Sequence, residues 1–302
     1  MEIRFDEQVA IVTGAGRGLG RSHAIAMASK GAKVVVNDFS GSNVISENAK
    51  SVVQEITSAG GEAIAHGANV ANFDQVQSMV NETIDKWGRV DILVNNAGIL
   101  RDKTFLKMSV EDMREVIDVH LMGSLNCSKA VWEIMREQSY GRIVLTSSSS
   151  GLYGNFGQTN YGAAKMAMVG VMNTLHLEGM KYNIKVNCLA PTAGTAMTDG
   201  LFPEPVFKLM PPESVSPGVV FLCSEDAPSR KVLAAGGGSF AIFKGFETEG
   251  VNLLPDELSA ESVAKYWDKI DSENNMQEPQ SGSAQSQKFA MQAAEKLGLD
   301  LS

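Results

Sequence analysis

A tyrosine and a lysine four positions apart are the residues of this sequence best placed for acid–base chemistry. Tyr161 and Lys165 lie in TNYGAAK (159–165), and none of the other four tyrosines has a lysine at this spacing. Residues at i and i+4 share one face of a helix, so the two side chains would be neighbours. An ammonium beside a phenol favours the phenolate and lowers a pKa that is ordinarily about 10. A phenol tuned in this way can remove the proton of an alcohol.

A run of serines precedes this pair and offers a hydroxyl that could hold the oxygen of a substrate. Ser148 lies 13 residues before Tyr161, close to the end of an apolar run that reads as a strand. Ser147, Ser149 and Ser150 are competing candidates. A serine run is also typical of a polar loop, so the choice among the four stays open at this point.

A glycine-rich turn near the start of the chain predicts a site for a pyrophosphate. TGAGRGLG (13–20) follows an apolar run, and its glycines have the spacing G-x-x-x-G-x-G. Glycines let the strand turn sharply into a helix, whose N-terminal N–H groups then face the anion without an intervening Cβ. The cofactor contacts expected here are Gly14, Arg17, Gly18, Leu19 and Gly20. The alternative is a glycine-rich turn without a ligand.

An aspartate at the end of the second apolar run indicates which dinucleotide is bound. Asp38 lies 18 residues after Gly20, where a carboxylate can accept hydrogen bonds from both ribose hydroxyls and would repel a 2′-phosphate. Arg17 argues the other way, since its guanidinium could meet a 2′-phosphate. The carboxylate acts on the ribose directly, and we therefore expect NAD rather than NADP.

A third motif, NNAG (95–98), follows the fourth apolar run. Small residues there would let the chain pass beneath the adenine ribose at the carboxyl edge of a sheet. This makes Asn96, Ala97 and Gly98 candidate cofactor contacts. An ordinary turn is the alternative, because Asn and Gly are common turn residues.

These motifs lie between segments that alternate between strand and helix patterns. Six apolar runs read as strands buried on both faces, at 9–12, 33–37, 62–67, 90–95, 141–147 and 184–190. Helical periodicity covers 75–87, 110–138 and 159–181. The alternation predicts right-handed crossovers and a doubly wound parallel sheet of the α/β class.

The composition changes after about residue 245. We therefore expect a dinucleotide-binding domain at 1–245 and a C-terminal helical extension at 246–302. In the extension, 259–270 has a helical apolar face, 271–287 reads as a polar linker or mobile loop, and 288–297 reads as a last short helix. A segment this small cannot form a core of its own, so it is expected to pack on the main domain or on a partner subunit.

Composition excludes several classes of partner. The formal net charge of −9 over 302 residues disfavours nucleic acid and anionic lipid. No apolar run approaches the roughly 20 residues that a helix needs to cross a bilayer. Cys127, Cys188 and Cys223 lack the spacing of a zinc site or a disulfide framework, so no metal is expected.

The sequence shows neither of two common targeting signals, which predicts a cytoplasmic location. The start, MEIRFDEQVA, lacks the basic and apolar stretches of a signal peptide. The end, LDLS, differs from the peroxisomal Ser-Lys-Leu address. We expect a free-standing cytoplasmic protein; a peroxisomal location would require another signal or a longer chain of which this one is a module.

Taken together, TGAGRGLG, NNAG, Ser148 and Tyr161-x-x-x-Lys165 resemble the short-chain dehydrogenase/reductase family, in the family's order, over about residues 5–245. The resemblance implies a Rossmann-type sheet of about seven strands and a nicotinamide cofactor. It implies that Ser148 orients the substrate, that Tyr161 is the acid/base, and that Lys165 assists Tyr161 and binds the nicotinamide ribose. It adds Asn69, Val70 and Pro191 to the cofactor contacts.

A narrower resemblance concerns the substrate. The strings VVVND (34–38), NNAGILRD (95–102), YGRIV (140–144) and YGNFGQTNY (153–161) are similar to the (3R)-hydroxyacyl-CoA dehydrogenase units of type 2 peroxisomal multifunctional enzymes. Those units oxidise (3R)-hydroxyacyl-CoA to 3-ketoacyl-CoA with NAD, form homodimers and carry a C-terminal extension. Some also act on steroid alcohols. The resemblance implies an NAD-dependent dehydrogenase acting on an acyl-CoA, or alternatively on a steroid or other bulky alcohol, and a homodimer. The alternative from another class is a non-catalytic NAD-binding redox sensor.

The sequence departs from the family at several positions. His120, in VHLMG, stands where the family often has an active-site asparagine, and it could relay a proton through a ring nitrogen or simply pack. Asn69 stands where an aspartate commonly meets the adenine amino group, although an amide oxygen can still accept that bond. Pro191 is followed by Thr192 in place of the usual glycine, which leaves Thr195 and Thr198 as alternative contacts to the carboxamide. Tyr153 and Phe156 are expected to line an apolar cleft, with 201–212 as a candidate lid.

Overall fold

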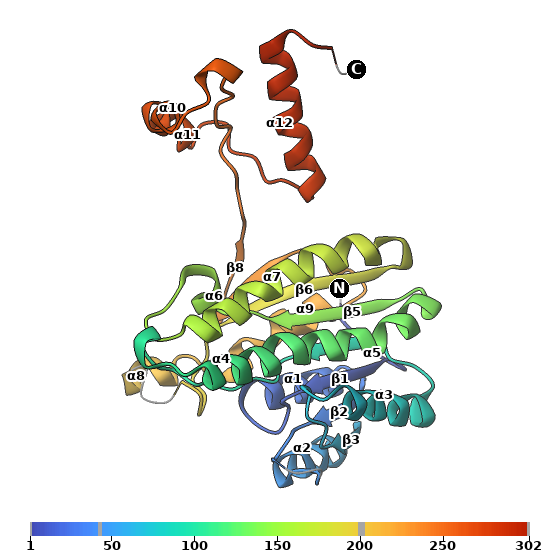
Figure 1. Ribbon diagram of the computed structural model, residues 1–302. Coiled ribbons are helices and arrows are strands. Elements are labelled where there is room, and N and C mark those ends of the chain that lie inside the picture. Colours follow the sequence, from blue (N-terminus) through green and yellow to red (C-terminus); the bar gives the residue numbers. More distant parts are fainter. Residues whose placement is uncertain (1, 42–43, 199–202, 301–302) are drawn as a thin grey trace. The chain divides into compact units, whose positions relative to one another are not determined.

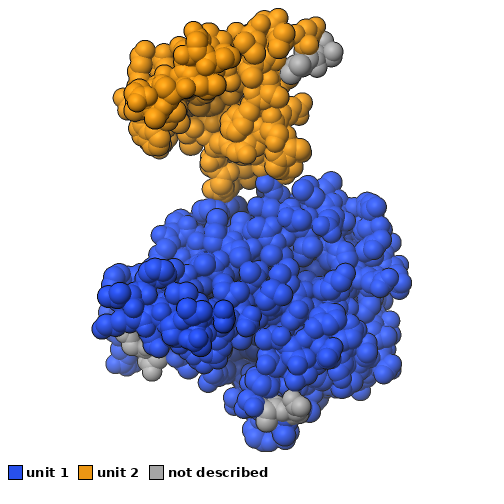
Figure 2. All heavy atoms as spheres, in the orientation of Figure 1, with its two compact units in different colours: residues 1–243 blue, residues 244–302 orange. Residues whose placement is uncertain are grey.

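The computed structural model describes residues 2–41, 44–198 and 203–300. The chain divides into two compact units, residues 1–243 and residues 244–302 (Figure 2). Each unit is described separately below.

The first unit is built on one sheet whose strands have the order β3-β2-β1-β4-β5-β6-β7-β8 (Figure 1). All neighbouring strands pair in parallel except β7 and β8, which are antiparallel. The predicted doubly wound α/β class is therefore confirmed. The strands are β1 Val9–Thr13, β2 Lys33–Asn37, β3 Glu62–His66, β4 Ile92–Asn95, β5 Gly141–Thr146, β6 Ile184–Pro191, β7 Val232–Gly236 and β8 Ser239–Phe243.

Two of these strands, β7 and β8, have no counterpart among the six runs read from the sequence, and the described residues hold eight strands rather than about seven. Between them Gly237 and Gly238 have φ angles of 55° and 77°. A two-residue turn with positive φ at both positions is the favoured connection of a tight hairpin, and a Gly-Gly pair supplies it. The sequence of β7 is apolar and mostly buried, and that of β8 is apolar but mostly exposed, and both runs were missed despite their composition.

Helices cover both faces of the sheet. Side chains of α1, α2 and α9 pack on one face, and side chains of α3, α5 and α7 pack on the other. Successive strand residues alternate between the two cores: Ala10 and Val12 face the first, and Ile11 faces the second. The helices are α1 Gly18–Ser29, α2 Glu47–Ser58, α3 Phe73–Trp87, α4 Val110–Ile117, α5 Gly123–Gln138, α6 Ser149–Tyr153, α7 Thr159–Gly179, α8 Glu204–Lys208 and α9 Ser216–Cys223.

The long helical pattern at 110–138 is interrupted in the structure. A π-helical segment, Asp118–Met122, joins α4 to α5 and contains the buried His120. The wider turn displaces the side-chain positions by one residue, and such segments occur frequently at functional sites.

The second unit holds α10 Ala260–Lys265, α11 Trp267–Ile270 and α12 Gly282–Leu297. The prediction of a polar linker over 271–287 was wrong at its end, because α12 begins at Gly282, with the Ser281 hydroxyl accepting from the Ala284 N–H. Polar residues near a helix start are explained by this capping. Lys288 ties α12 back to the start of the unit through Glu247.

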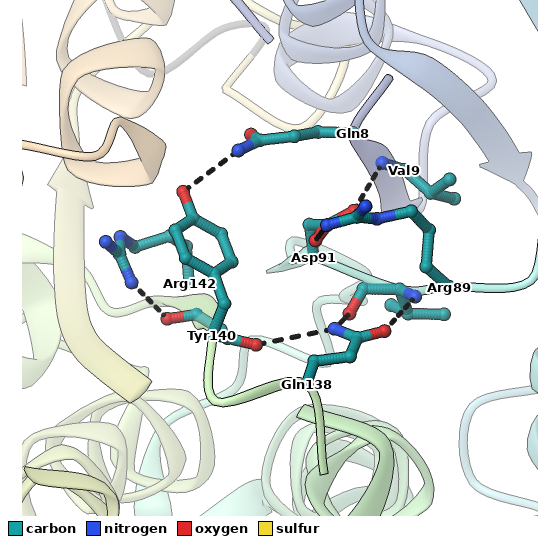
Figure 3. A network of polar contacts seen from close by, with 9 residues as sticks. Gln8, Val9, Arg89, Asp91, Gln138, Tyr140 and Arg142 are labelled. Atoms are coloured by element: carbon teal, nitrogen blue, oxygen red, sulfur yellow. Dashed lines mark hydrogen bonds and ion pairs between the residues drawn. The ribbon is translucent and has the colours of Figure 1, made fainter. Parts of the chain in front are cut away.

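At the amino ends of the strands, a polar network joins β1, β4 and β5 (Figure 3). The Asp91 carboxylate is fully buried; it accepts from the Val9 N–H at 2.9 Å and from the Arg89 guanidinium at 2.7 and 2.8 Å. Gln138 bonds both the N–H and the carbonyl of Val90. The network fixes the strand starts on the edge of the sheet away from the glycine turn.

Arg142 is the largest fully buried side chain of the described residues. Its guanidinium donates to the carbonyls of Gly141 and Asn183 and to those of Ser224 and Glu225, at 2.8–3.1 Å. It also lies 4.1 Å from the centroid of the Tyr140 ring. A buried cation is tolerated because several backbone dipoles are directed at it.

Replacing Arg142 by Met should destabilise the protein by roughly 2–4 kcal/mol, because four carbonyls each lose a hydrogen bond from the buried guanidinium. Chemical unfolding measures the change. Lys185→Met is the matched control, since Lys185 donates to the same Glu225 carbonyl from a partly exposed position, and its loss should cost about 0.5 kcal/mol or less. Equal effects of the two substitutions would contradict the assignment.

Candidate active site

The predicted site residues gather at the carboxyl edge of the sheet. The strand order reverses between β1 and β4, so the segments that follow these two strands diverge and leave a crevice between them. Gly14 follows β1, Asn96 follows β4, and Ser148 follows β5 within two residues. A doubly wound sheet binds its ligands at this point.

The glycine turn lies directly against the NNAG segment. Gly14 and Gly18 have φ angles of 62° and 55°, which favour glycine. A Cβ added to Gly14 would lie 2.8 Å from the Cα of Ala97. The Asn96 amide donates to the carbonyls of Thr13 and Gly14 at 2.9 and 3.1 Å. Asn96 therefore holds the turn with its side chain, while the backbone N–H groups at the start of α1 remain available to an anion.

Asp38 is held in place by the cap of the next helix. Ser46 donates to the Asp38 carboxylate at 2.6 Å and accepts from the Ala49 N–H at the start of α2. A Cβ on Gly16 would collide with this carboxylate, so the glycine turn and Asp38 are in close contact. The turn and the acid thus form one cradle that fits the phosphates and ribose of a dinucleotide.

Five further predicted cofactor contacts differ in their exposure and in their hydrogen bonds. Arg17 is exposed at the N-cap of α1, and the half-buried Leu19 packs on the core. The Asn69 amide oxygen already accepts from the Ala71 N–H at 3.0 Å. Val70 is buried, and Pro191 ends β6. All five lie at the carboxyl side of their strands.

The structure brings Ser148, Tyr161 and Lys165 together. The Ser148 hydroxyl lies close enough to the Tyr161 phenol to lower the pKa of the phenol. The Lys165 Nζ lies 5.5 Å from the centroid of the Tyr161 ring and donates to the Thr146 carbonyl at 2.6 Å. Ser147 is fully buried and donates to the Lys165 carbonyl. Of the four serines, Ser148 is the one that acts on the pKa of the Tyr161 phenol.

The electrostatics differ from the sequence expectation. Burial raises the pKa of Tyr161, the hydrogen bond from Ser148 opposes this effect, and the Asp102 carboxylate adds to it. Burial also lowers the pKa of Lys165 to about 7. The expectation of an acidified phenol neglected desolvation, which disfavours the charged form of both groups.

His120 packs against the phenol. The two rings are nearly perpendicular, with centroids 5.2 Å apart. His120 Nε2 lies 2.8 Å from the carbonyl oxygen and 3.0 Å from the nitrogen of Ile99, although one ring nitrogen can serve only one of them at a time. Nδ1 is buried and has no hydrogen-bond partner among the described residues. Burial and the nearby Lys165 lower the pKa of His120 to about 3, so the imidazole is neutral at physiological pH.

Aromatic side chains lie beside the site. Tyr153, at the end of α6, is 73% exposed and contacts the Phe243 ring, and Phe156 is 88% exposed. Of the candidate lid 201–212, residues 201 and 202 lie outside the described residues, and α8 follows them.

The two threonines that were alternative contacts to the carboxamide differ in their surroundings. Thr198 bonds the backbone of Ala193 and Thr195, whereas the Thr195 methyl group lies over Gly18.

Several residues that hold the site were missed from the sequence. The Thr13 hydroxyl accepts from the N–H groups of Asn96 and Ala97 at 3.0 and 3.1 Å. Gly16 and Ser46 position Asp38, as described above. A serine before a helical pattern is a capping signal and could have marked Ser46. The role of Thr13 depends on β1 lying beside β4, which no local pattern reports.

A family profile described as short chain dehydrogenase matches residues 8–204. The chain belongs to the short-chain dehydrogenase family. Members of this family are oxidoreductases that typically bind NAD or NADP, so the chain is an oxidoreductase. The cradle of glycines and Asp38 fits such a dinucleotide.

Three similar proteins extend this assignment. A short-chain type dehydrogenase/reductase of Mycobacterium tuberculosis is 46% identical over 87% of this chain and 94% of its own. The structure of full-length peroxisomal multifunctional enzyme type 2 of Drosophila melanogaster matches with a TM-score of 0.83 and 36% identity, over 98% of this chain and 51% of that one. This short-chain dehydrogenase thus spans about half of the Drosophila protein. A 7α-hydroxysteroid dehydrogenase complexed with NADH and 7-oxoglycochenodeoxycholic acid matches with a TM-score of 0.71 and 31% identity, over 78% and 95% of the two chains.

Two further features of the described residues bear on binding. They contain no group of three or more His, Cys, Asp or Glu side chains that could hold a metal ion. Within the same residues, every helix is too short or too polar to cross a bilayer.

Lys165→Met should change how stability depends on pH. The folded-state pKa of Lys165 is about 7, below the 10.5 of an unperturbed lysine, so the unfolded state binds this proton more tightly. The cost of the buried charge is therefore fully present below pH ~7 and disappears as the pH rises toward ~10.5. Relative to the parent, the variant should gain on the order of 2–4 kcal/mol at low pH compared with high pH.

The measurement is the free energy of unfolding of both proteins from pH 6 to about 10. The lost hydrogen bond to Thr146 is a pH-independent offset, so only the slope is diagnostic. Lys129→Met, at an exposed position of α5, should show no such slope. Parallel curves for parent and Lys165→Met would refute the depressed pKa.

Proposed function

We propose that this chain is an NAD-dependent dehydrogenase that oxidises a (3R)-hydroxyacyl-CoA to the 3-ketoacyl-CoA. The observation that carries the proposal is the meeting of the Ser148 hydroxyl, the Tyr161 phenol and the Lys165 ammonium beside a dinucleotide cradle. The resemblance to the dehydrogenase units of type 2 peroxisomal multifunctional enzymes supports the acyl-CoA substrate.

The cradle residues would hold the cofactor by its two ends. Gly14, Gly18 and Gly20 leave the backbone open to the pyrophosphate, and Asp38 accepts from the adenosine ribose. The Lys165 ammonium would reach the nicotinamide ribose. When bound, the dinucleotide supplies the hydride acceptor. The fixed Asp38 carboxylate favours NAD over NADP, because a 2′-phosphate would meet a negative charge.

Three side chains of the protein bind the substrate hydroxyl and transfer its proton. Ser148 Oγ holds the substrate oxygen, and Tyr161 Oη accepts the hydroxyl proton during oxidation and returns it during reduction. Lys165 lies under the phenol and stabilises its anion when charged. His120 packs against Tyr161 as a neutral ring rather than relaying protons, since its Nε2 is occupied by Ile99 and its pKa is far below neutrality.

A steroid or another bulky secondary alcohol is the second candidate substrate. It is favoured by the similarity to the 7α-hydroxysteroid dehydrogenase and by the exposed apolar rings of Tyr153 and Phe156.

A homodimer is proposed on the family resemblance, and the exposed Leu177 and Met180 near the end of α7 are consistent with an interface there. The cytoplasmic location remains a prediction, because the Drosophila relative is a peroxisomal enzyme.

Turnover of (3R)-hydroxyacyl-CoA thioesters and of steroid alcohols, followed as NADH formation, tests the function. Tyr161→Phe should reduce kcat by roughly 10²–10⁴-fold and keep NAD binding within a few-fold, because only the proton acceptor is lost. Tyr182→Phe, a surface tyrosine that bonds Arg136, should behave like the parent. Full activity of Tyr161→Phe would refute the role of Tyr161 as the proton acceptor. No turnover by the parent would favour a redox sensor instead, and steroid turnover alone would favour the second substrate.

Asp38→Asn tests the choice of cofactor. The amide keeps an oxygen for the Ser46 hydroxyl and removes the charge that repels a 2′-phosphate. The ratio of the NADP and NAD dissociation constants should shift toward NADP by about tenfold or more, as measured by isothermal titration. Glu47→Gln, a neighbouring exposed carboxylate, should leave the ratio unchanged. An unaltered ratio in Asp38→Asn would remove the basis for NAD specificity.

A further inference from the structure

The segment 101–103 is fastened to the start of the helix that carries Tyr161. The Lys103 N–H donates to the Gly157 carbonyl at 3.0 Å. The Asn160 amide donates to the Arg101 carbonyl at 3.2 Å, while its oxygen accepts from the N–H of Tyr161 itself at 2.8 Å. The position of the phenol is therefore coupled to this segment through the residue next to it.

A third connection between the segment 101–103 and the start of α7 involves the Asp102 carboxylate. Gln158, the N-cap residue of α7, is 6% exposed and donates from Nε2 to the Asp102 carboxylate at 2.6 Å. Its amide oxygen accepts from the Asn155 side chain at 3.1 Å, which fixes the orientation of the amide. Asp102 is exposed to solvent, yet this bond gives its carboxylate a defined place beside the first turn of α7.

Neighbouring residues hold the same segment from the other side. Lys103 forms an ion pair of 2.7 Å with Asp112 in α4, and Asn160 also reaches the Asp112 carbonyl. The segment is thus anchored to the start of α4 and to the start of α7. Such double anchoring explains how an exposed carboxylate can hold a fixed position.

We propose that Asp102 is a positioning residue of the site: through Gln158 it holds the first turn of α7, and it places a fixed negative charge beside that turn, which carries Tyr161. The inference rests on the proposed function, in which Tyr161 exchanges the substrate proton. It concerns a residue that has no place in the glycine cradle or among the three groups that meet at the phenol.

The charge has a defined consequence for Tyr161. His120 in the π-helical segment and Lys165 in α7 itself lie against the Tyr161 ring. Ser148 after β5 and the Asp102 carboxylate also act on the pKa of the phenol. His120 is neutral, and the Lys165 ammonium is partly deprotonated near neutral pH. Asp102 raises the pKa of the phenol and adds to the effect of burial, so it stabilises the protonated form that donates a proton when a ketone is reduced.

The test replaces Tyr161 by 3-fluorotyrosine and follows its fluorine resonance against pH in the full-length protein without substrate. The fluorinated phenol is more acidic, which brings its titration into a range where the protein stays folded. Asp102→Asn keeps an acceptor oxygen for Gln158 and removes the charge. Its titration midpoint should fall by roughly 0.5 pH unit at low salt, and the difference should shrink at high salt because an exposed charge is screened.

Two variants control for structure. Asp102→Glu retains the charge and should titrate within about 0.1 pH unit of the parent. Glu111→Gln removes another exposed carboxylate, from α4, and should do the same. An Asp102→Asn curve that coincides with that of the parent, or that moves to higher pH, would overturn the proposal.

Kinetics separate this inference from the proposed function. If the parent oxidises alcohols, Asp102→Asn should move the acid limb of kcat/KM for oxidation to lower pH by the same amount as the fluorine titration. Turnover with no shift in either readout refutes the role of Asp102 and leaves the dehydrogenase assignment intact. A fluorine shift in a protein that turns over no alcohol refutes the assignment alone.

Discussion

The burial of the Lys165 ammonium beneath the Tyr161 ring is the constraint on which the site depends. The side chain is 4% exposed, and the Thr146 carbonyl is the acceptor of its hydrogen bond. A charge in this position is costly, so its pKa falls to about 7 and the amine is ready to lose or gain a proton. The arrangement persists because rigid elements impose it: Thr146 ends β5, and the Lys165 carbonyl is fixed by Ser147.

The two edges of the sheet divide the tasks of stability and chemistry. At the amino edge, Asp91 and Arg142 are buried, and strong hydrogen bonds satisfy them within the protein (Figure 3). At the carboxyl edge, Asn96 and Thr13 lock the backbone, whereas Asp38, Ser148 and Tyr161 keep polar atoms that a ligand can use. A parallel sheet produces this division, since all its strands end at one edge and its crossovers diverge there.

The loops at the carboxyl edge are as constrained as the strands. Ser46 caps α2 and orients Asp38 with the same hydroxyl. Asn160 and Gln158 join the start of α7 to the segment that follows NNAG. Because these loops cover Tyr161, Lys165 and His120, burial is the main cause of the pKa shifts of all three side chains.

The sequence by itself determined the features that lie within one element or one turn. The Tyr161–Lys165 spacing, the glycine turn, Asp38 and the alternation of strands and helices are all local patterns, and the fold class and family that they predicted are confirmed. Which serine faces the phenol, the contact of Gly16 with Asp38 and the direction of the Tyr161 pKa were decided only by the tertiary structure. The β7–β8 hairpin and the start of α12 were missed from the sequence, although Gly237-Gly238 and Ser281 are local signals of a tight turn and of a helix cap. Periodicity reports the neighbours of a residue along the chain, whereas burial and charge depend on groups that packing brings from distant segments.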